Sequence, residues 1–370
     1  MNIKYHIFLP VCLLLASCST PQKNDFPSWA MGPFVRPAGV NPVISPDPGS
    51  IFFCPMTQDS VGWEESDTFN PAATTKDGKT YVLYRAEDNS ATGIGKRTSR
   101  IGLAESTDGI TMTRLPEPVL FPADDGFGDV DWPGGCEDPR VAMTENGTYV
   151  MLYTSWNREV ARLSVATSDD LTHWQKHGYV FQDSHNGRFN DMACKSGSIV
   201  TRLDVERQVI AKIDGKYFMY WGEHGVSAAT SDDLIHWTPI LNDQGELLKI
   251  ILPRKGYFDS MLTECGPPAI ITKDGILLLY NGKNADNEDR DSRYAAGSYC
   301  AGQVLFSLDD PYKVINRLDE PFFLPEAEFE KSGQYVDGTV FIEGLVYFQK
   351  KWFLYYGCAD SQVGVAIYNP

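Results

Sequence analysis

Polar side chains that could exchange protons recur at the predicted strand ends of this 370-residue chain. A carboxyl group that donates a proton to a leaving oxygen, with a second carboxyl that assists attack by water, can break a glycosidic bond. The separation of the two groups sets the stereochemistry, at about 5 Å for retention and roughly 6.5 to 9.5 Å for inversion. The candidates are Asn70, Arg85, Glu87, Asp88, Glu137, Asp138, Arg140, Lys195, Glu223, His224, Glu264, Lys283, Glu343 and Asp360.

Motifs for other chemistries are weak in this sequence. A Gly-x-Ser-x-Gly nucleophile elbow is absent, and Gly78-Lys79-Thr80 is preceded by Ala73 where a phosphate-binding loop requires glycine. His173 and His177 would face one metal ion only on a helix, but a strand-to-turn segment is predicted there. We therefore expect neither a metal site nor a cofactor.

Strand pairs of one kind recur along the chain and indicate a repeat. Each pair contains a tyrosine near its end, and these tyrosines are spaced 60 to 75 residues apart. Asn-Gly and Asp-Gly supply the positive φ angles of a tight hairpin turn, so each pair is predicted to be antiparallel. The tyrosines are Tyr84, Tyr153, Tyr220, Tyr280 and Tyr355, and the predicted turns are Asp77-Gly78, Asn146-Gly147, Asp214-Gly215, Asp274-Gly275 and Lys350-Lys351.

A second element follows each strand pair and is clearest at Ser168-Asp169-Asp170 and Ser231-Asp232-Asp233. We interpret these aspartates as turn formers whose side chains bind the backbone. Because both elements recur in the same order, the sequence predicts an all-β fold, a five-bladed β-propeller formed by residues 36–370 as one domain. A β-sandwich with chance periodicity is the alternative. In a propeller the innermost strands would line a central funnel, with the candidate residues at its mouth.

The N-terminal residues resemble a bacterial lipoprotein signal. A short apolar stretch from Ile7 to Ala16 leads into Leu15-Ala16-Ser17-Cys18, and small residues before a cysteine suit a signal peptidase. We predict a signal peptide over residues 1–17, lipidation at Cys18 and a tether over residues 18–35. Membrane attachment through Cys18 would place the protein in the cell envelope, at the outer membrane. An ordinary signal peptide with an incidental cysteine is the alternative.

Composition narrows the partners of the folded part. The formal charge is −17, from 49 acidic and 32 basic residues, which disfavours a nucleic-acid partner and suits a neutral ligand. The hydrophobic fraction of 42% is ample for a sizeable core. None of the six cysteines after the signal forms a close pair, so a zinc ribbon is disfavoured and buried thiols are expected. The oligomeric state is not predicted.

Several motifs in order resemble glycoside hydrolase family 130 from about Asn70 to the C-terminus. The family has a five-bladed propeller and acts on β-mannosides, by phosphorolysis in many members and by hydrolysis in others. The resemblance therefore implies a mannose-containing oligosaccharide substrate. The motifs are Phe69-Asn70-Pro71-Ala72-Ala73, Tyr84-Arg85-Ala86-Glu87-Asp88, Gly135-Cys136-Glu137-Asp138-Pro139-Arg140, Lys195-Ser196-Gly197, Gly266-Pro267-Pro268 and Tyr355-Tyr356-Gly357-Cys358-Ala359-Asp360.

The resemblance also implies residue roles. Asp138 would be the general acid, or in a bland alternative a strand-end brace paired with Arg140. The residues implied to bind the substrate are Asn70, Arg85, Asp88, Lys195, Lys283 and Asp360.

The choice between hydrolysis and phosphorolysis depends on the strand end after the third hairpin. Phosphorylase members place an arginine there, whereas this chain has Glu223, which would repel a phosphate dianion. Glu223 and Glu264 match two glutamates of the family's β-1,2-mannosidase group. The resemblance thus implies an inverting exo-acting β-1,2-mannosidase in which both glutamates serve the attacking water, the base being either one.

Two other functions stay open at this point. Lys195, Arg202, Lys283 and His224 could assemble a phosphate site from different blades, which would make the protein a β-mannoside phosphorylase. A lipid-anchored carbohydrate-binding propeller without catalysis is the third possibility, although it would give Asp138 no chemical role.

Overall fold

The computed structural model describes residues 26–370 and has an all-β fold, as the sequence predicts. The predicted signal peptide and Cys18 lie outside these residues. The helical elements of the described part are α1 (Gly128–Asp131) and a 3-10 turn at Glu328–Glu330. No helix in the range 26–370 has the length and apolarity needed to cross a membrane.

Antiparallel pairing divides most strands of the described chain into five consecutive groups. The first group is β3 (Asp67–Lys76), β4 (Lys79–Glu87), β5 (Ser99–Ser106) and β6 (Thr113–Arg114), and the second is β7 (Gly135–Met143), β8 (Tyr149–Trp156), β9 (Ala161–Ser168) and β10 (Gln175–Tyr179). The third is β11 (Gly197–Asp204), β14 (Lys216–Trp221), β15 (Ser227–Ser231) and β16 (Trp237–Pro239). The fourth is β17 (Leu262–Cys265), β18 (Ala269–Ile271), β19 (Ile276–Lys283), β20 (Tyr299–Phe306) and β21 (Val314–Arg317), and the fifth is β22 (Val340–Phe348), β23 (Lys351–Cys358) and β24 (Gln362–Tyr368). Short strands complete the chain: β1 (Ile51–Cys54), β2 (Asp59–Gly62), β12 (Arg207–Ile210) and β13 (Lys212–Ile213).

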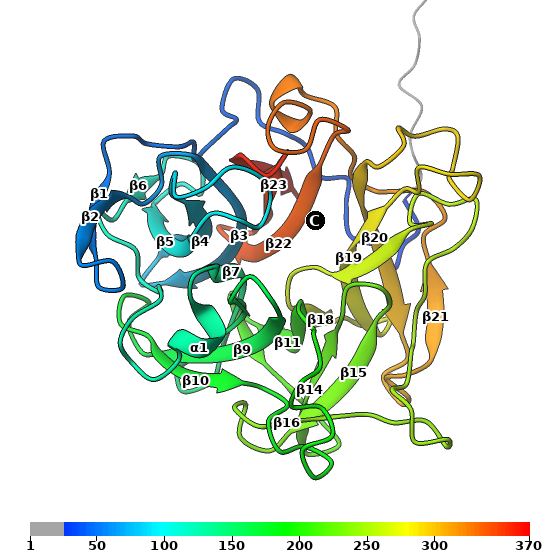
Figure 1. Cartoon of the computed structure of the whole chain (residues 1–370). Helices are drawn as coiled ribbons and strands as arrows, with labels where there is room; N and C mark the ends of the chain where they lie inside the picture. The colour runs from blue at the N-terminus through cyan, green and yellow to red at the C-terminus, as the bar shows by residue number, and fades with distance from the viewer. Residues whose placement is uncertain (1–25) are drawn as a thin grey trace, which may run out of the picture.

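The groups surround a common centre (Figure 1). Their hydrophobic residues form separate clusters, each shared by two neighbouring groups, and one cluster joins the fifth group back to the first through residues such as Val82 and Phe353. Every group is therefore buried on both faces by its neighbours. This packing leaves the innermost strands to define the middle of the molecule.

The hairpin turns have the backbone that their residues favour. Asp77 and Gly78 have φ angles of 48° and 74°, and Asp214 and Gly215 have 49° and 82°. These left-handed values explain the choice of Asp and Gly. In the fifth pair, β22 ends at Phe348 and β23 begins at Lys351, so the turn residues are Gln349 and Lys350. The predicted turn at Lys350-Lys351 is thus one residue too late.

The Ser-Asp-Asp elements are turns, as predicted. The Asp170 Oδ1 atom accepts hydrogen bonds of 2.8 Å from the backbone nitrogens of Thr172 and His173. The Asp233 side chain makes the equivalent bonds after β15. These aspartates hold the outer loops and lie far from any proton-transfer role.

The N-terminal segment packs into the fold instead of forming a tether up to residue 35. The backbone nitrogen of Val35 donates to the carbonyl of Ile367 on β24, and Ile44 bridges Val363 on the same strand. The backbone of Met31 exchanges hydrogen bonds of 2.8 and 2.7 Å with the Gln303 side chain. The segment therefore supplies an outer edge partner for the fifth group, and the predicted tether over 18–35 is too long.

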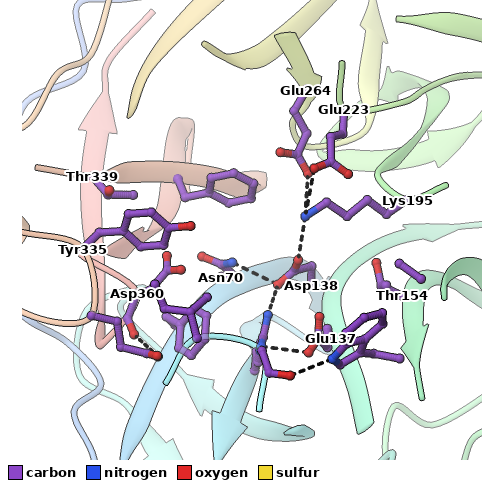
Figure 2. Close-up of a pocket in the computed structure, with 18 of the residues that line it drawn as sticks. Asn70, Glu137, Asp138, Thr154, Lys195, Glu223, Glu264, Tyr335, Thr339 and Asp360 are labelled. Carbon is purple, nitrogen blue, oxygen red and sulfur yellow. Dashed lines mark hydrogen bonds and ion pairs between the residues drawn. The ribbon is translucent and has the colours of Figure 1, made fainter. Parts of the chain in front are cut away.

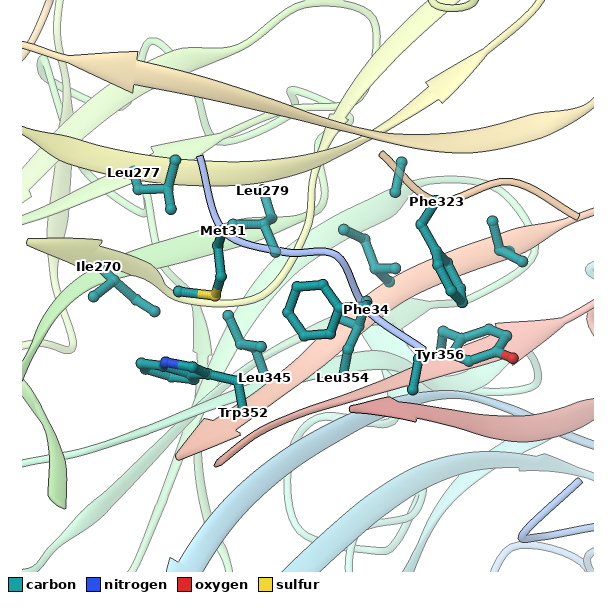
Figure 3. Close-up of a cluster of buried hydrophobic side chains, with 14 of the residues drawn as sticks. Met31, Phe34, Ile270, Leu277, Leu279, Phe323, Leu345, Trp352, Leu354 and Tyr356 are labelled. Carbon is teal, nitrogen blue, oxygen red and sulfur yellow. The ribbon is translucent and has the colours of Figure 1, made fainter. Parts of the chain in front are cut away.

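Met31 and Phe34 are buried between the fourth and fifth groups (Figure 3). Their neighbours come from both groups, so the N-terminal segment seals the junction between them. The neighbours drawn in the figure are Ile270, Leu277, Leu279, Phe323, Leu345, Trp352, Leu354 and Tyr356.

We expect Phe34→Ala to lower the free energy of unfolding by about 3 kcal/mol, because it removes a buried ring and leaves a cavity at this junction. Urea denaturation followed by tryptophan fluorescence measures the loss. Val35→Ala is the matched control, since the Val35 side chain is 62% exposed and should cost little. Equal stability of both variants would show that the segment contributes no packing energy.

Candidate active site

A cavity of about 270 Å³ brings together most of the residues predicted to form the site (Figure 2). Its lining includes six carboxyl groups and two cationic side chains. Predicted residues that line it are Asn70, Arg85, Asp138, Lys195, Glu223, Glu264 and Asp360. Predicted residues that do not line it are Asp88 and Lys283.

Irregularities in the innermost strands aim key side chains at this cavity. The β3 register shifts between Phe69 and Pro71, and the β7 register shifts between Glu137 and Arg140. Asn70 and Asp138 occupy these bulges with φ angles of 45° and 48°, values that non-glycine residues rarely adopt. A bulge inserts an extra residue and redirects its side chain. The strained backbone at both positions is typical of functional sites.

Close backbone approach around Asn70 requires a glycine on the neighbouring β23. A Cβ atom at Gly357 would lie 2.3 Å from Asn70 Oδ1 and 2.9 Å from its backbone nitrogen. Any side chain there would displace the Asn70 amide. The Tyr-Gly-Cys sequence at the end of β23 is therefore a packing requirement of the site.

Arg85 on β4 is the cationic centre of one half of the cavity. Its guanidinium contacts Glu87 at 2.6 Å, Glu137 at 2.8 Å and Asp138 at 3.1 Å. Burial opposes its charge, but the surrounding carboxylates raise the pKa of Arg85 well above its ordinary value. With three carboxylates bound, Arg85 has little capacity to bind an additional anion.

Asp138 is held by the cations around it. Its Oδ1 atom accepts a hydrogen bond of 2.9 Å from the Asn70 amide. Burial alone would raise the pKa of Asp138, but Arg85 and Lys195 lower it to about 2. Asp138 is thus a carboxylate at neutral pH in this arrangement, and a role as general acid requires a change in its surroundings.

Two other carboxyl groups favour the protonated state. Burial raises the pKa of Glu137 to about 7, against the opposing effect of Arg85. Burial likewise raises the pKa of Asp360 to about 7. The cavity therefore holds protons close to neutral pH, next to the Asp138 carboxylate.

Lys195 links the two sides of the cavity. Its ammonium lies 3.9 Å from Asp138 Oδ2, 4.0 Å from Glu223 Oε1 and 3.6 Å from Glu264 Oε1 (Figure 2). Burial opposes the ammonium form, but these carboxylates raise the pKa of Lys195 well above its ordinary value. The lysine therefore stays charged and holds the two glutamates opposite Asp138.

The two glutamates differ in environment. Glu264 is buried on β17, and its Oε1 atom accepts a hydrogen bond from the Ser196 hydroxyl. Burial raises the pKa of Glu264. Glu223 follows β14, and its side chain is 32% exposed, so it has access to water.

Arg140 supports the site from below instead of pairing with the Asp138 side chain. It donates 3.0 Å to the Asp138 carbonyl and 2.7 Å to the Cys265 carbonyl, which connects β7 to β17. Its charge is balanced by buried Glu343 at 2.8 Å, on β22. The bland alternative of an Asp138–Arg140 side-chain brace is not observed.

Asp88 and Lys283 were predicted to bind substrate, and the structure corrects both. The Asp88 carboxylate faces away from the cavity, where it accepts 2.8 Å from buried Arg100 and 3.0 Å from the Ser90 backbone. The Lys283 ammonium lies behind the cavity wall, 4.8 Å from the centre of the Tyr299 ring. Neighbouring positions in sequence alternate sides of a strand, so motif membership did not ensure access.

The alternative phosphate site is only partly assembled. Arg202 binds Glu145 at 2.6 Å and lines a different surface cavity. The exposed His224 lies 3.6 Å from Glu223, beside the mouth. Lys195 is thus the one residue of the proposed cationic set that lines the cavity.

Sequence reasoning missed the cavity walls. Loop residues and the second strands of the groups contribute uncharged side chains that carry no catalytic motif. They include Thr154, Trp156, Tyr299, Gln334, Tyr335, Thr339 and Phe341. Their positions depend on how neighbouring groups meet, which a motif search does not detect. Over residues 26–370, no set of three or more His, Cys, Asp or Glu side chains is arranged to hold a metal ion.

Comparison with known proteins identifies the class of enzyme. The chain matches the model of glycoside hydrolase family 130, described as beta-1,4-mannooligosaccharide phosphorylase, over residues 56–369. It is 33% identical over 310 residues to a 1,2-beta-oligomannan phosphorylase of Thermoanaerobacter sp. (strain X514), covering 82% of this chain and 90% of the relative.

Solved structures are more similar. A glycosyl hydrolase from Bacteroides ovatus is 61% identical, with a TM-score of 0.92 and coverage of 94% of this chain and 96% of that chain. Another, described as "The GH130 family of mannoside phosphorylases contains glycoside hydrolases that target beta-1,2 mannosidic linkages in Candida mannan", is 61% identical with a TM-score of 0.93, covering 94% and 97%. The protein is therefore an enzyme that acts on mannosides. It belongs to glycoside hydrolase family 130.

The raised pKa of Asp360 predicts a pH-dependent stability. The unfolded chain loses this proton near pH 4, whereas the folded chain keeps it to about pH 7. Stability from this group therefore decreases as the pH rises from about 4 to about 7. We expect Asp360→Asn to gain free energy of unfolding relative to the wild type at pH 8, compared with pH 4. Urea denaturation at both pH values tests this, and a pH-independent difference would contradict it.

Proposed function

We propose that the five antiparallel groups are the blades of a five-bladed β-propeller. The support is the repeated order of strands, the clusters between successive groups and the cluster that joins the last group to the first. In this arrangement the cavity lies at one end of the central funnel, and the N-terminal segment completes the fifth blade. Radial packing of this kind protects most strand edges.

We propose that the enzyme is an inverting, exo-acting β-1,2-mannosidase that hydrolyses terminal β-mannosides of mannan-type glycans. The carrying observation is the charge of the cavity, in which six carboxyl groups face only Arg85 and Lys195. Both cations are already engaged by carboxylates. A phosphate dianion would meet net repulsion there, whereas water and neutral sugar hydroxyls would not.

Water activation falls to the glutamates opposite Asp138. Glu223 and Glu264 both reach Lys195, so their carboxylates lie near one another and one of them can accept the proton of an attacking water. The proton for the leaving oxygen comes from Asp138. A sugar ring that excludes water and moves Lys195 away from Asp138 would raise the pKa of that carboxyl and let it be protonated.

Phosphorolysis is the second candidate. The 33% identical relative is a phosphorylase, and the partly exposed Lys195 is a cation that faces the cavity. A non-catalytic sugar-binding protein is less supported, since it would not need an acid and two glutamates around one lysine.

We also propose that the enzyme is a cell-envelope lipoprotein at the outer membrane, anchored through Cys18. The support is the sequence of the first 18 residues, with small residues before the cysteine.

Incubation with β-1,2-mannobiose separates the two reactions. We expect mannose as the product in phosphate-free buffer, and little change in rate when phosphate is added. Chromatography of the products with a mannose 1-phosphate standard provides the measurement. Mannose 1-phosphate that forms only with phosphate present would instead establish the phosphorylase.

Removal of the proposed acid and bases should reduce turnover while sugar binding persists. We expect Asp138→Asn, Glu223→Gln and Glu264→Gln each to lower kcat by a factor on the order of a hundred or more. Each substitution keeps the size of the side chain and one oxygen acceptor. Mannose release measures kcat, and calorimetry with mannose measures binding. Unchanged turnover in Asp138→Asn would remove this residue from the mechanism.

A further inference from the structure

Four buried threonine hydroxyls in the described chain have no hydrogen-bond partner within the protein. They belong to Thr68, Thr154, Thr263 and Thr339, and each side chain is at most 1% exposed. Buried polar atoms are normally paired, since an unpaired one costs about 1 to 3 kcal/mol. Two of these residues, Thr154 and Thr339, line the active-site cavity, and the other two do not.

Thr154 and Thr339 lie on opposite sides of the cavity (Figure 2). The Thr339 carbonyl accepts a hydrogen bond of 3.1 Å from the Ala359 nitrogen, which places Thr339 beside Asp360. Thr154 on β8 is the cross-strand partner of Glu137, next to Asp138. The two hydroxyls therefore flank the proposed acid from two directions.

The wall around Thr154 also has apolar surface. Trp156, two residues further along β8, donates 2.8 Å to the Gly95 carbonyl and so fixes the loop that carries Ile94. All of these residues line the cavity. An apolar wall with an unpaired hydroxyl suits a pyranose ring, which has an apolar face and hydroxyls that both donate and accept.

We propose that Thr339 binds a hydroxyl of the terminal mannose and that Thr154 binds a hydroxyl of the leaving-group sugar. This inference rests on the proposed function, because Asp138 must protonate the oxygen between the two sugars. Thr339 is assigned to the terminal sugar by its place beside Asp360. Thr154 is assigned to the leaving group because it lies beyond Asp138, on the wall with Trp156.

Threonine-to-valine variants test the proposal, because valine keeps the shape and removes the hydroxyl. We expect Thr339→Val to weaken binding of mannose by about threefold to tenfold, the value of one hydrogen bond. Thr154→Val should leave mannose binding unchanged and raise the KM for β-1,2-mannobiose by a similar factor. Thr339→Ser and Thr154→Ser keep the hydroxyl and should restore binding. Calorimetry and mannose release supply the two measurements.

Thr68→Val and Thr263→Val are the matched controls. Both remove a buried, unpaired hydroxyl from an inner strand without touching the cavity, so neither binding nor KM should change. Urea denaturation should show no loss of stability in any of the four valine variants, because no protein hydrogen bond is removed. Binding losses in the controls equal to those in the cavity variants would overturn the proposal.

Failure of the inference and failure of the proposed function give different results. If the wild type releases no mannose from β-1,2-mannobiose with or without phosphate, the proposed function is wrong. The binding of mannose and of mannobiose to the same variants then still decides the threonine roles. Unchanged affinity for both sugars in Thr154→Val and Thr339→Val would overturn the inference even in an active enzyme, and a wild type that binds neither sugar would overturn both.

Discussion

Negative charge is concentrated in a cavity from which water is largely excluded, and every part of the site serves to hold it there. Arg85 binds three carboxylates on one side, and Lys195 reaches three on the other. Because two cations cannot balance six carboxyl groups, burial raises the pKa of Glu137 and Asp360 to about 7. The same imbalance stores protons beside the Asp138 carboxylate and disfavours a bound phosphate dianion.

Such a charge cluster requires a rigid frame. Side chains of neighbouring groups bury one another around the ring, and the N-terminal segment seals the last junction through Met31 and Phe34. Tyrosines that the repeat suggests as packing residues also anchor buried ion pairs. Their hydroxyls donate to carboxylates that are neutralised by arginines, in the sets Tyr84 with Glu64 and Arg114, Tyr280 with Asp259 and Arg317, and Tyr356 with Glu330 and Arg36.

The inner strands convert this frame into a site by breaking their own regularity. The bulges at Asn70 and Asp138 add one residue each and turn the side chains toward the cavity, at the cost of left-handed backbone angles. Arg140 then ties the Asp138 carbonyl to β17. The acid and the glutamates are thus fixed relative to each other by backbone contacts and do not depend on flexible loops.

The sequence by itself determined the all-β fold, most of the hairpin turns and seven of the residues that meet in the cavity, because turn chemistry and motif order are local properties of the chain. Only the tertiary structure decided that Asp88 binds Arg100, that Lys283 lies behind Tyr299 and that residues 31–35 belong to the core. Which face of a strand reaches the centre depends on bulges and on the neighbouring group. The unpaired hydroxyls of Thr154 and Thr339 became visible for the same reason, since a missing partner is a property of the assembled ring.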